Sequence, residues 1–285
     1  MNENVISNLL KYIKETTGNS KLIESILKLK DKKVNIMIIG GTGVGKSSTI
    51  NALFGEKIAK VGDNPAPETM EITQFNLDSN ITLWDSPGLG DGVKDNEHKE
   101  KIISLLKKKD NESNMLIDCV LVILSANNKD LGTEYELINN ILIPNIEEPE
   151  KRVIIAINKA DEALSSKYWN RQENKPSLEQ KKFLEDKLQD IKLRIYESTN
   201  IDIKNPLYYS AGYSDENFSE PPYNIDNLMI YILESVPPSK VANTVETFGE
   251  NITKEVIKTG VEIIKGVINL GTGIIKGFLK ALFGK

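Results

Sequence analysis

The feature that most constrains this chain is the run Gly40-Gly41-Thr42-Gly43-Val44-Gly45-Lys46-Ser47, which lies between an apolar stretch at 34–39 and an amphipathic stretch that begins at Lys46. Glycines at these positions let successive backbone N–H groups curl around phosphate oxygens. Lys46 then reaches the β- and γ-phosphates, and the Ser47 hydroxyl is placed to ligate Mg²⁺. This strand–loop–helix context predicts that the loop, with Ser48 at its end, binds a nucleoside triphosphate rather than forming a turn without a ligand.

Composition narrows the class of protein. A chain of 285 residues with 39% hydrophobic content can form one substantial domain with accessory elements. The formal net charge of -5 argues against a general nucleic-acid binder. The single cysteine, Cys119, cannot form an internal disulfide and is predicted to be a buried thiol in a reducing compartment. Residues 1–10 lack the basic-then-apolar order of a signal peptide, so a cytoplasmic protein is expected.

Apolar and amphipathic stretches alternate along most of the chain. We expect N-terminal helices at 1–32, a nucleotide-binding domain at 33–236 and a basic helical tail at 237–285. In the middle part, the alternation predicts an α/β fold with helices on both faces of a mostly parallel sheet. Only three residues separate Leu77 from Ile81, which predicts a hairpin and one antiparallel edge strand. The predicted strands are 34–39, 72–77, 81–84, 117–124, 153–157 and 207–210, and the predicted helices are 46–54, 96–109, 133–145, 177–198 and 225–235.

A second motif, Asn158-Lys159-Ala160-Asp161, follows the apolar stretch at 153–157, which places it at the carboxyl edge of the sheet. There Asp161 is expected to accept hydrogen bonds from guanine N1–H and from the exocyclic amine. Adenine has neither donor, so ATP would leave this carboxylate unpaired. Asn158 is expected to brace the loop, and the stem of Lys159 to cover the face of the base.

A third segment, Ser210-Ala211, follows the apolar stretch at 207–209. Its position after a strand predicts that the Ala211 N–H points at guanine O6. Together with the motif that ends at Asp161, this segment favours GTP and GDP over ATP, although an ATPase remains the alternative at the level of the nucleotide.

The segment Asp85-Ser86-Pro87-Gly88 also ends an apolar strand. Asp85 is therefore expected to face the Mg²⁺ shell and the Gly88 N–H to contact the γ-phosphate. The polar stretch 56–70 offers Thr69 as a hydroxyl that closes over Mg²⁺, whereas the nearby Thr73 falls inside a predicted strand. The predicted metal ligands are Ser47, Thr69 and Asp85, and the predicted catalytic residues are Lys46, Thr69 and Gly88.

These motifs together resemble the translation-factor-related class of P-loop GTPases, in particular its Era-like branch, over about residues 33–236. The segment Leu83–Gly92 looks like that of bacterial small GTPases labelled ribosome-binding-like. More distantly, the chain is similar to immunity-related GTPases, which flank the GTPase core with N- and C-terminal helices. The resemblance implies a three-layer GTPase domain with a six-stranded sheet, one antiparallel strand, GTP as substrate and Mg²⁺ as cofactor.

Hydrolysis of GTP requires a residue or partner that orients the attacking water. In Ras-like enzymes a glutamine follows the motif that ends here at Gly88, but this chain has Leu89, which can neither donate nor accept a hydrogen bond. Potassium-dependent relatives carry an asparagine where this chain has Gly43. His98 is expected to be a solvated residue early in a helix rather than a catalytic one. We therefore predict slow intrinsic turnover, or turnover stimulated by a partner or a second protomer.

Beyond Pro238, apolar residues recur at three- and four-residue steps from Val256 to Phe283, and after Glu262 all charged side chains are lysines. This pattern is typical of a basic amphipathic helix. Its uncharged stretch at 266–275 is too short to span a bilayer, which needs roughly 20 apolar residues. An interfacial helix on an anionic membrane is favoured slightly, while packing on the N-terminal helices and self-association remain open.

The sequence thus favours a cytoplasmic, Mg²⁺-dependent GTP-hydrolysing switch with a peripheral membrane-associated tail. The expected partners are GTP and GDP, a second copy in a homodimer or oligomer, and an anionic membrane surface, without strong evidence for nucleic acid. A ribosome-associated or translation-related GTPase is one alternative, although no dedicated basic domain is evident outside the tail. A nucleotide-gated scaffold with little hydrolysis is the other.

Overall fold

A six-stranded sheet with the strand order β2-β3-β1-β4-β5-β8 forms the centre of the computed structural model. The model describes residues 5–30, 32–55, 72–77, 81–85, 95–214, 219–248, 252–268 and 272–283. Strand β1 pairs in parallel with β3 and β4, and β5 pairs in parallel with β4 and β8. Strand β2 runs antiparallel to β3 at the edge of the sheet. The predicted α/β fold with one antiparallel edge strand is confirmed.

The elements lie close to their predicted positions. The strands of the sheet are β1 (Val34–Ile39), β2 (Thr73–Asn76), β3 (Ile81–Asp85), β4 (Cys119–Ser125), β5 (Val153–Asn158) and β8 (Leu207–Tyr208). The helices around it are α3 (Lys46–Phe54), α5 (Asp95–Leu106), α6 (Gly132–Leu137), α7 (Ile143–Asn145), α8 (Pro149–Arg152), α9 (Leu178–Thr199) and α10 (Ile225–Ser235). Two short strand pairs, β6 (Trp169–Asn170) with β7 (Lys175–Pro176) and β9 (Tyr213–Ser214) with β10 (Ser219–Glu220), lie outside the main sheet.

Two predicted elements differ from the observed ones. The helix predicted at 133–145 is divided into α6, a π-helical turn at Ile138–Leu142 and α7, which has Pro144 in its first turn. Proline lacks the N–H that a regular helix needs and clashes with the preceding turn. The tail, predicted as one basic helix, forms α11 (Val241–Thr247), α12 (Lys254–Ile268) and α13 (Thr272–Phe283).

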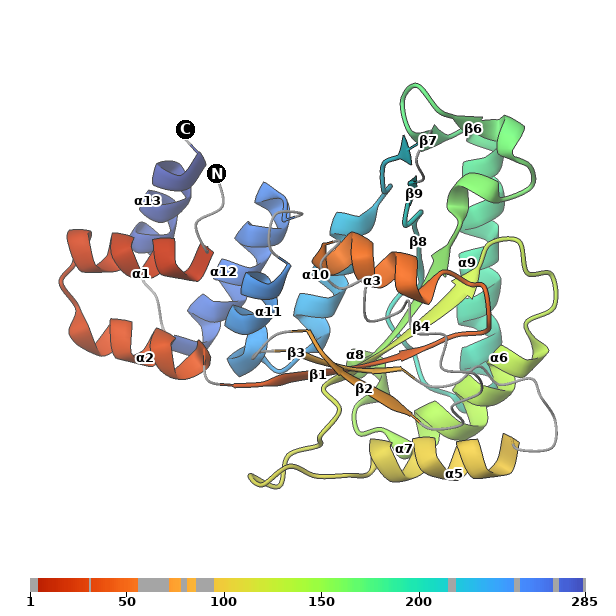
Figure 1. Cartoon of the computed structure of the whole chain (residues 1–285), viewed down its shortest axis with the longest axis horizontal. Helices are drawn as coiled ribbons and strands as arrows, with labels where there is room; N and C mark the ends of the chain where they lie inside the picture. Colours follow the sequence, from red (N-terminus) through yellow and green to blue (C-terminus); the bar gives the residue numbers. More distant parts are fainter. Residues whose placement is uncertain are drawn as a thin grey trace.

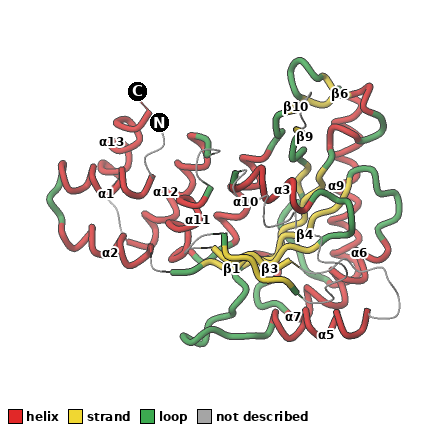
Figure 2. The backbone as a smooth tube through the Cα atoms, viewed as in Figure 1, coloured by secondary structure: helices red, strands yellow, loops and turns green. Residues whose placement is uncertain are grey.

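Side chains of the sheet alternate between two hydrophobic cores. On β1, Val34, Ile36 and Ile38 belong to one core, and Met37 and Ile39 belong to the other. Successive residues of a strand point to opposite faces, so a strand with a helical layer on each side is apolar throughout. The second core is filled by α5, α9 and the segment from α6 to α7, which cover one face of the sheet (Figures 1 and 2). Cys119 is buried in the first core as predicted, and burial raises the pKa of its thiol to about 12.

The other face carries α3 and α10 and, beyond them, a helical unit made of both ends of the chain. This unit consists of α1 (Val5–Thr16), α2 (Ser20–Lys30), α11, α12 and α13, and it lies at the left of Figure 1, away from α9. Its buried side chains are continuous with the core of that face. The rings of Tyr12 in α1 and Phe278 in α13 have centroids 5.9 Å apart. Packing of the tail on the N-terminal helices is therefore the arrangement in this structure.

The apolar side of the tail is buried within the helical unit. Its buried residues in α12 and α13 are Val256, Ile257, Val261, Ile264, Ile275 and Phe278. Gly260 permits the close contact of α12 with α11, since a Cβ there would lie 2.4 Å from a methyl group of Val245. Among the helices of the described ranges, none is both long and apolar enough to cross a membrane.

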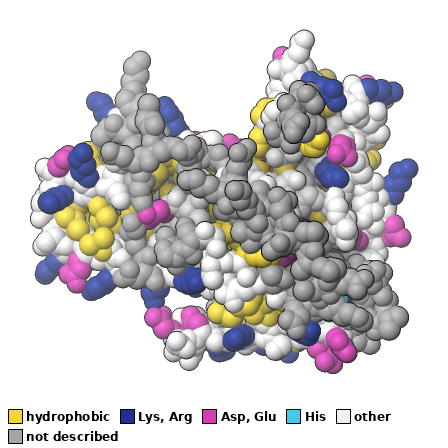
Figure 3. All heavy atoms as spheres, in the orientation of Figure 1, with side chains coloured by type: hydrophobic (Ala, Val, Ile, Leu, Met, Phe, Trp, Pro, Cys, Tyr) yellow, Lys and Arg dark blue, Asp and Glu magenta, His cyan; other side chains and the backbone are white. Residues whose placement is uncertain are grey.

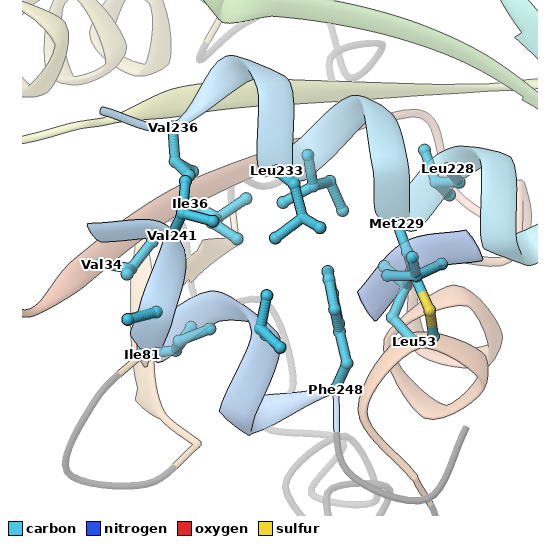
Figure 4. Close-up of a cluster of buried hydrophobic side chains, with 14 of the residues drawn as sticks. Val34, Ile36, Leu53, Ile81, Leu228, Met229, Leu233, Val236, Val241 and Phe248 are labelled. Carbon is cyan, nitrogen blue, oxygen red and sulfur yellow. The ribbon is translucent and has the colours of Figure 1, made fainter. Parts of the chain in front are cut away.

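Phe248, directly after α11, joins the tail to the helix that follows the glycine-rich loop. Its ring is fully buried and stacks on Phe54 at the end of α3, with centroids 5.6 Å apart. Figure 4 shows Phe248 pointing from the tail toward Leu233 and Met229 of α10, with Leu53 of α3 nearby. A residue far outside the predicted nucleotide-binding domain thus fills a space between two of its helices.

A buried ion pair ties the start of the tail to the sheet. Lys240 Nζ lies 2.8 Å from both carboxylate oxygens of Asp118, which precedes β4, and the Asn35 N–H donates to the same carboxylate at 2.8 Å. Burial raises the pKa of Asp118, and the Lys240 charge opposes that rise. Removing one partner of such a pair leaves an uncompensated buried charge, so the contact fixes where the tail begins.

We expect Phe248→Ala to lower the free energy of unfolding by about 3–5 kcal/mol, because it deletes a fully buried ring and leaves a cavity. Urea unfolding of the full chain measures this loss. Leu178→Ala, at a residue that is 88% exposed, is the control and should change stability little. A loss below about 1 kcal/mol for Phe248→Ala would contradict this packing of the tail.

Candidate nucleotide site

The glycine-rich loop runs from the end of β1 to the start of α3, at the carboxyl edge of the sheet (Figure 1). Gly45 has φ +92°, a backbone conformation that side chains disfavour, and a Cβ there would lie 2.3 Å from Nδ2 of Asn158. A Cβ at Gly40 would lie 2.5 Å from the carbonyl oxygen of Ile123. Both glycines are required by close contacts with neighbouring strands, and the exposed Thr42, Gly43, Ser47 and Ser48 form the mouth of the loop.

Lys46 lies at the first position of α3 with its ammonium group over the loop. Nζ donates to the carbonyl oxygens of Gly40 at 2.9 Å and Gly41 at 3.3 Å. These two bonds hold the lysine ammonium at the loop where phosphate oxygens are expected. Partial positive charge at a helix N-terminus adds to its field and favours an anion at this point.

The carboxamide of Asn158 joins three segments of the site. Its Nδ2 donates to the Val44 carbonyl at 2.9 Å, and its Oδ1 accepts from the Ala211 N–H at 3.0 Å. Asn158 is 2% exposed, so both contacts are shielded from water. The predicted role of Asn158 as a brace is thus seen in the geometry, and it links the glycine-rich loop to the third segment as well as to its own loop.

The segment that contains Asp161 turns away from β5 in a fixed geometry. Lys159 adopts φ +63°, and the Ala160 N–H donates to the Tyr209 carbonyl at 3.1 Å. Gln180 of α9 supports this turn from below, because its Nε2 donates to the Ala163 carbonyl at 2.7 Å and to the Asp161 carbonyl at 3.4 Å. Asp161 itself is partly exposed, which leaves its carboxylate accessible to a ligand.

The segment Ser210-Ala211 forms the remaining wall. Ser210 is buried, its backbone forms two hydrogen bonds with Tyr223, and its Oγ accepts from the Gly212 N–H at 3.3 Å. The Ala211 N–H is bound to Asn158 rather than directed outward. In this arrangement the N–H holds Asn158, and its contact with guanine O6 stays a prediction.

The residues predicted to hold Mg²⁺ fit that ion where they are described. Asp85 ends β3 and is paired in register with Ile38 of β1, directly before the glycine-rich loop. Its Oδ1 is buried without a hydrogen-bond partner among the described residues. Burial raises the pKa of Asp85, while the Lys46 charge lowers it. A buried carboxylate oxygen without such a partner is the type of ligand that Mg²⁺ prefers.

Two predicted site residues, Thr69 and Gly88, lie outside the described residues, as does Leu89. Their predicted roles therefore stay predictions. The expectation that His98 is solvated is wrong, because this residue is 9% exposed and its Nε2 has no hydrogen-bond partner in the described part of the chain. His98 lies in the first turn of α5 and faces the protein interior. The weak amphipathic pattern of this helix did not predict that burial.

Sequence reasoning missed three residues that shape the site. Thr49 and Tyr209 form a buried hydrogen bond of 2.6 Å between their hydroxyl groups, and Gln180 supports the turn at Asp161. Thr49 and Tyr209 are 160 positions apart. A polar residue within an otherwise apolar stretch was the signal that the sequence offered at Thr49 and at Tyr209. No rule of sequence spacing connects two positions so far apart.

The sheet order, the glycine-rich loop and the two further segments at the same edge define the fold class. They are the features of the P-loop GTPase class of α/β proteins. The comparisons with known proteins agree with this class.

Residues 35–159 match the family model described as "50S ribosome-binding GTPase", which is less than half of the chain. The uncharacterized protein YkfA of Escherichia coli is 32% identical over 149 residues, which cover 51% of this chain and 48% of YkfA. Translocase of chloroplast 159 of Arabidopsis thaliana is 35% identical over 97 residues, which cover 33% of this chain and 6% of that protein. The matches therefore span about half of YkfA and a small part of the translocase.

Among solved structures, LeoA, the bacterial dynamin GTPase from ETEC, has a TM-score of 0.50 at 14% sequence identity. The match covers 94% of this chain and 49% of LeoA. At this identity the likeness concerns the fold, and it extends over both the nucleotide-binding part and most of the helical unit.

We expect Asp85→Asn to have opposite effects on stability and on Mg²⁺-dependent binding. The pKa of Asp85 is raised in the folded state, so over that pH range the folded protein binds more protons than the unfolded chain. The free energy of unfolding therefore falls as pH rises from the unfolded-state pKa through the folded-state pKa. The variant should therefore unfold at a higher temperature than the wild type at neutral pH without ligands, and this gain should disappear toward about pH 4. Its Mg²⁺-dependent affinity for GTP should fall about tenfold or more.

Thermal unfolding across pH and a Mg²⁺ titration of GTP binding measure both effects. Asp186→Asn, at an exposed position of α9, is the matched control. Unchanged Mg²⁺ dependence in the Asp85 variant would remove this residue from the metal site.

Proposed function

We propose that this protein is a Mg²⁺-dependent switch that binds and hydrolyses GTP. The observation that carries the proposal is the bridge through Asn158, from Val44 on one side to Ala211 on the other. It unites the loop suited to phosphates and the turn suited to guanine into one site. The family model that matches residues 35–159 is a GTPase model, which supports the same activity.

The proposed roles of the site residues follow from their positions around the glycine-rich loop and the turn at Asp161. Lys46 moves from the Gly40 and Gly41 carbonyls to the β- and γ-phosphates and neutralises charge there. The loop N–H groups hold the phosphate oxygens, and Asp161 selects guanine through its two donors. Bound Mg²⁺ would stabilise charge on the β–γ bridge, held by Ser47 and Asp85, with Thr69 as the further proposed ligand and Gly88 as the contact to the γ-phosphate.

The proposed turnover is slow in the isolated protein and faster when a partner or a second copy completes the site. The residue after Gly88 is Leu89, whose side chain cannot orient water. Phosphate contacts raise the affinity for GTP, but without a side chain that orients water they do little for the rate of hydrolysis. We therefore include a homodimer or oligomer in the proposal. We also propose that the chain belongs to the Era-like branch of these GTPases.

The proposed membrane contact is made by the assembled helical unit rather than by an unfolded tail. Residues 5–30 and 252–283 carry ten lysines and four glutamates, a formal charge of +6 in a chain of net charge -5. Lys276 and Lys280 of α13 are exposed, whereas the apolar side of α13 is buried at Ile275 and Phe278. Attraction between lysines and anionic headgroups needs no opening of the core. We propose a cytoplasmic protein that reaches a membrane surface in this way, with 1–32 and 237–285 flanking a GTPase domain at 33–236.

A ribosome-associated GTPase is the second candidate, because the description of the matching family names the 50S ribosome. A particle rich in phosphate would attract the same lysines as an anionic membrane. The scaffold alternative, with little hydrolysis, differs in turnover alone and is separated by the measurement of phosphate release below.

We expect Asp161→Asn to lower the affinity for GTP by about 100-fold or more, because a carboxylate that accepts two hydrogen bonds is replaced by a carboxamide that both donates and accepts. The variant should bind xanthosine triphosphate better than the wild type does, since the xanthine 2-oxo group accepts from the new amide. Competition of unlabelled nucleotides against labelled GTP measures these affinities. ATP that competes as strongly as GTP with the wild type, or an unaltered Asp161→Asn variant, would contradict guanine recognition; Asp186→Asn is again the control.

We expect phosphate release per protein to rise with protein concentration and to rise further with vesicles that contain anionic lipid. The double variant Lys276→Gln and Lys280→Gln should keep its activity without vesicles and lose about tenfold or more in vesicle binding, at about 1 kcal/mol per lysine. Flotation with anionic and with neutral vesicles, alongside phosphate release over a concentration series, provides the measurement. Constant activity per protein would sink the role of a second copy, and equal flotation of both proteins would sink the role of these lysines.

A further inference from the structure

Tyr209 and Thr49 form a buried chain of hydroxyl groups that ends on the glycine-rich loop. The Thr49 hydroxyl donates to the Gly45 carbonyl at 2.8 Å, and it lies 2.6 Å from the Tyr209 hydroxyl. A threonine hydroxyl has one proton, which is used toward Gly45, so the Tyr209 hydroxyl must be the donor to Thr49. Both side chains have no exposed surface. The direction of the chain is therefore from Tyr209 through Thr49 to Gly45.

The backbone of Tyr209 contacts the other half of the site. Its N–H donates to the Ile157 carbonyl at 2.8 Å, and its carbonyl accepts from the Ala160 N–H at 3.1 Å. These bonds hold both sides of Asn158 and the start of the turn that carries Asp161. Tyr209 thus reaches the phosphate half through its side chain and the base half through its backbone.

Gly45 is the point where these contacts meet. Its carbonyl accepts from both the backbone N–H and the hydroxyl of Thr49, at 2.9 Å and 2.8 Å. The adjacent Val44 carbonyl accepts from Asn158. Two contacts therefore fix the two peptide groups on either side of Gly45. Asn158, at the end of β5, holds the first, and Tyr209, directly after β8, holds the second through Thr49.

We propose that Tyr209 and Thr49 are positioning residues that set the distance between the phosphate-binding and base-binding loops, and so make the recognition of guanine and of phosphates cooperative. Neither side chain touches the nucleotide. Burial raises the pKa of the Tyr209 phenol above its usual value, which favours the protonated, hydrogen-bond-donating form. This inference rests on the proposed binding of GTP, since it concerns the two ends of that ligand.

The physical basis is the geometry of a ligand with two anchored ends. GTP gains full affinity only when both loops are held at the separation that the nucleotide requires. A ligand that occupies one loop alone does not sense that separation. Loss of the hydroxyl chain should therefore weaken GTP and GDP but leave inorganic tripolyphosphate, which fills the phosphate half alone, unaffected.

The test compares Tyr209→Phe, Thr49→Val and the double variant with Thr49→Ser, which retains a hydroxyl group. Tyr12→Phe is the matched control, because it removes a phenol hydroxyl from α1, where the Tyr12 ring lies tilted against Phe278 in the helical unit. Affinities for GTP, GDP and tripolyphosphate are measured by competition against labelled GTP with the full chain. Thermal unfolding without ligand shows whether each variant is folded.

We expect Tyr209→Phe and Thr49→Val each to weaken GTP and GDP by about fivefold, the equivalent of about one hydrogen bond, with tripolyphosphate changed by less than about twofold. The double variant should be no weaker than either single variant, because the two residues act in one chain. Thr49→Ser and Tyr12→Phe should bind as the wild type does.

Equal loss of GTP and tripolyphosphate affinity, additive effects in the double variant, or unchanged GTP binding in Tyr209→Phe would each overturn the inference. These outcomes leave the proposed function intact, because the wild type still prefers GTP. Absence of GTP binding by the wild type would overturn the proposed function and this inference together.

Discussion

The carboxamide of Asn158 is the contact on which the rest of the nucleotide site depends. It donates to the Val44 carbonyl and accepts from the Ala211 N–H, so three segments that are far apart in sequence share one buried side chain. The close approach leaves no room for a Cβ at Gly45. A glycine in the loop is therefore required by a neighbouring strand as well as by phosphate. The parallel order of β1, β4, β5 and β8 makes this possible, because it brings their carboxyl ends to one edge.

A second constraint connects the nucleotide site to the ends of the chain. The stacking of Phe54 on Phe248 places the tail directly against the helix that begins with Lys46. At the opposite edge of the sheet, Lys240 pairs with the buried Asp118. The helical unit is thus an extension of one hydrophobic core and not an appendage on a linker. In the proposed switch, any movement of α3 on exchange of nucleotide must be accommodated by this packing, which would connect the nucleotide site to the basic surface of the unit.

Charge is distributed in keeping with this architecture. The helical unit is basic within an acidic chain. The nucleotide site holds Lys46 close to the Asp85 carboxylate, whose Oδ1 has no hydrogen-bond partner among the described residues. Figure 3 shows lysine side chains, with acidic side chains among them, around an apolar patch on the helical unit. In the proposed membrane contact, the unit meets an anionic partner through its surface, and the packing inside it is preserved.

Local sequence was enough to predict the alternation of strands and helices and the chemistry of the motifs from Gly40 to Ser47 and from Asn158 to Asp161, because spacing within one loop is local information. The sequence could not show whether the apolar side of the tail packs on a bilayer or on other helices, because apolar residues at three- and four-residue steps suit both equally. Burial of His98 and the contact of Thr49 with Tyr209 also depended on tertiary packing. Such contacts join residues that no local rule relates, and only the folded sheet brings them within hydrogen-bond distance.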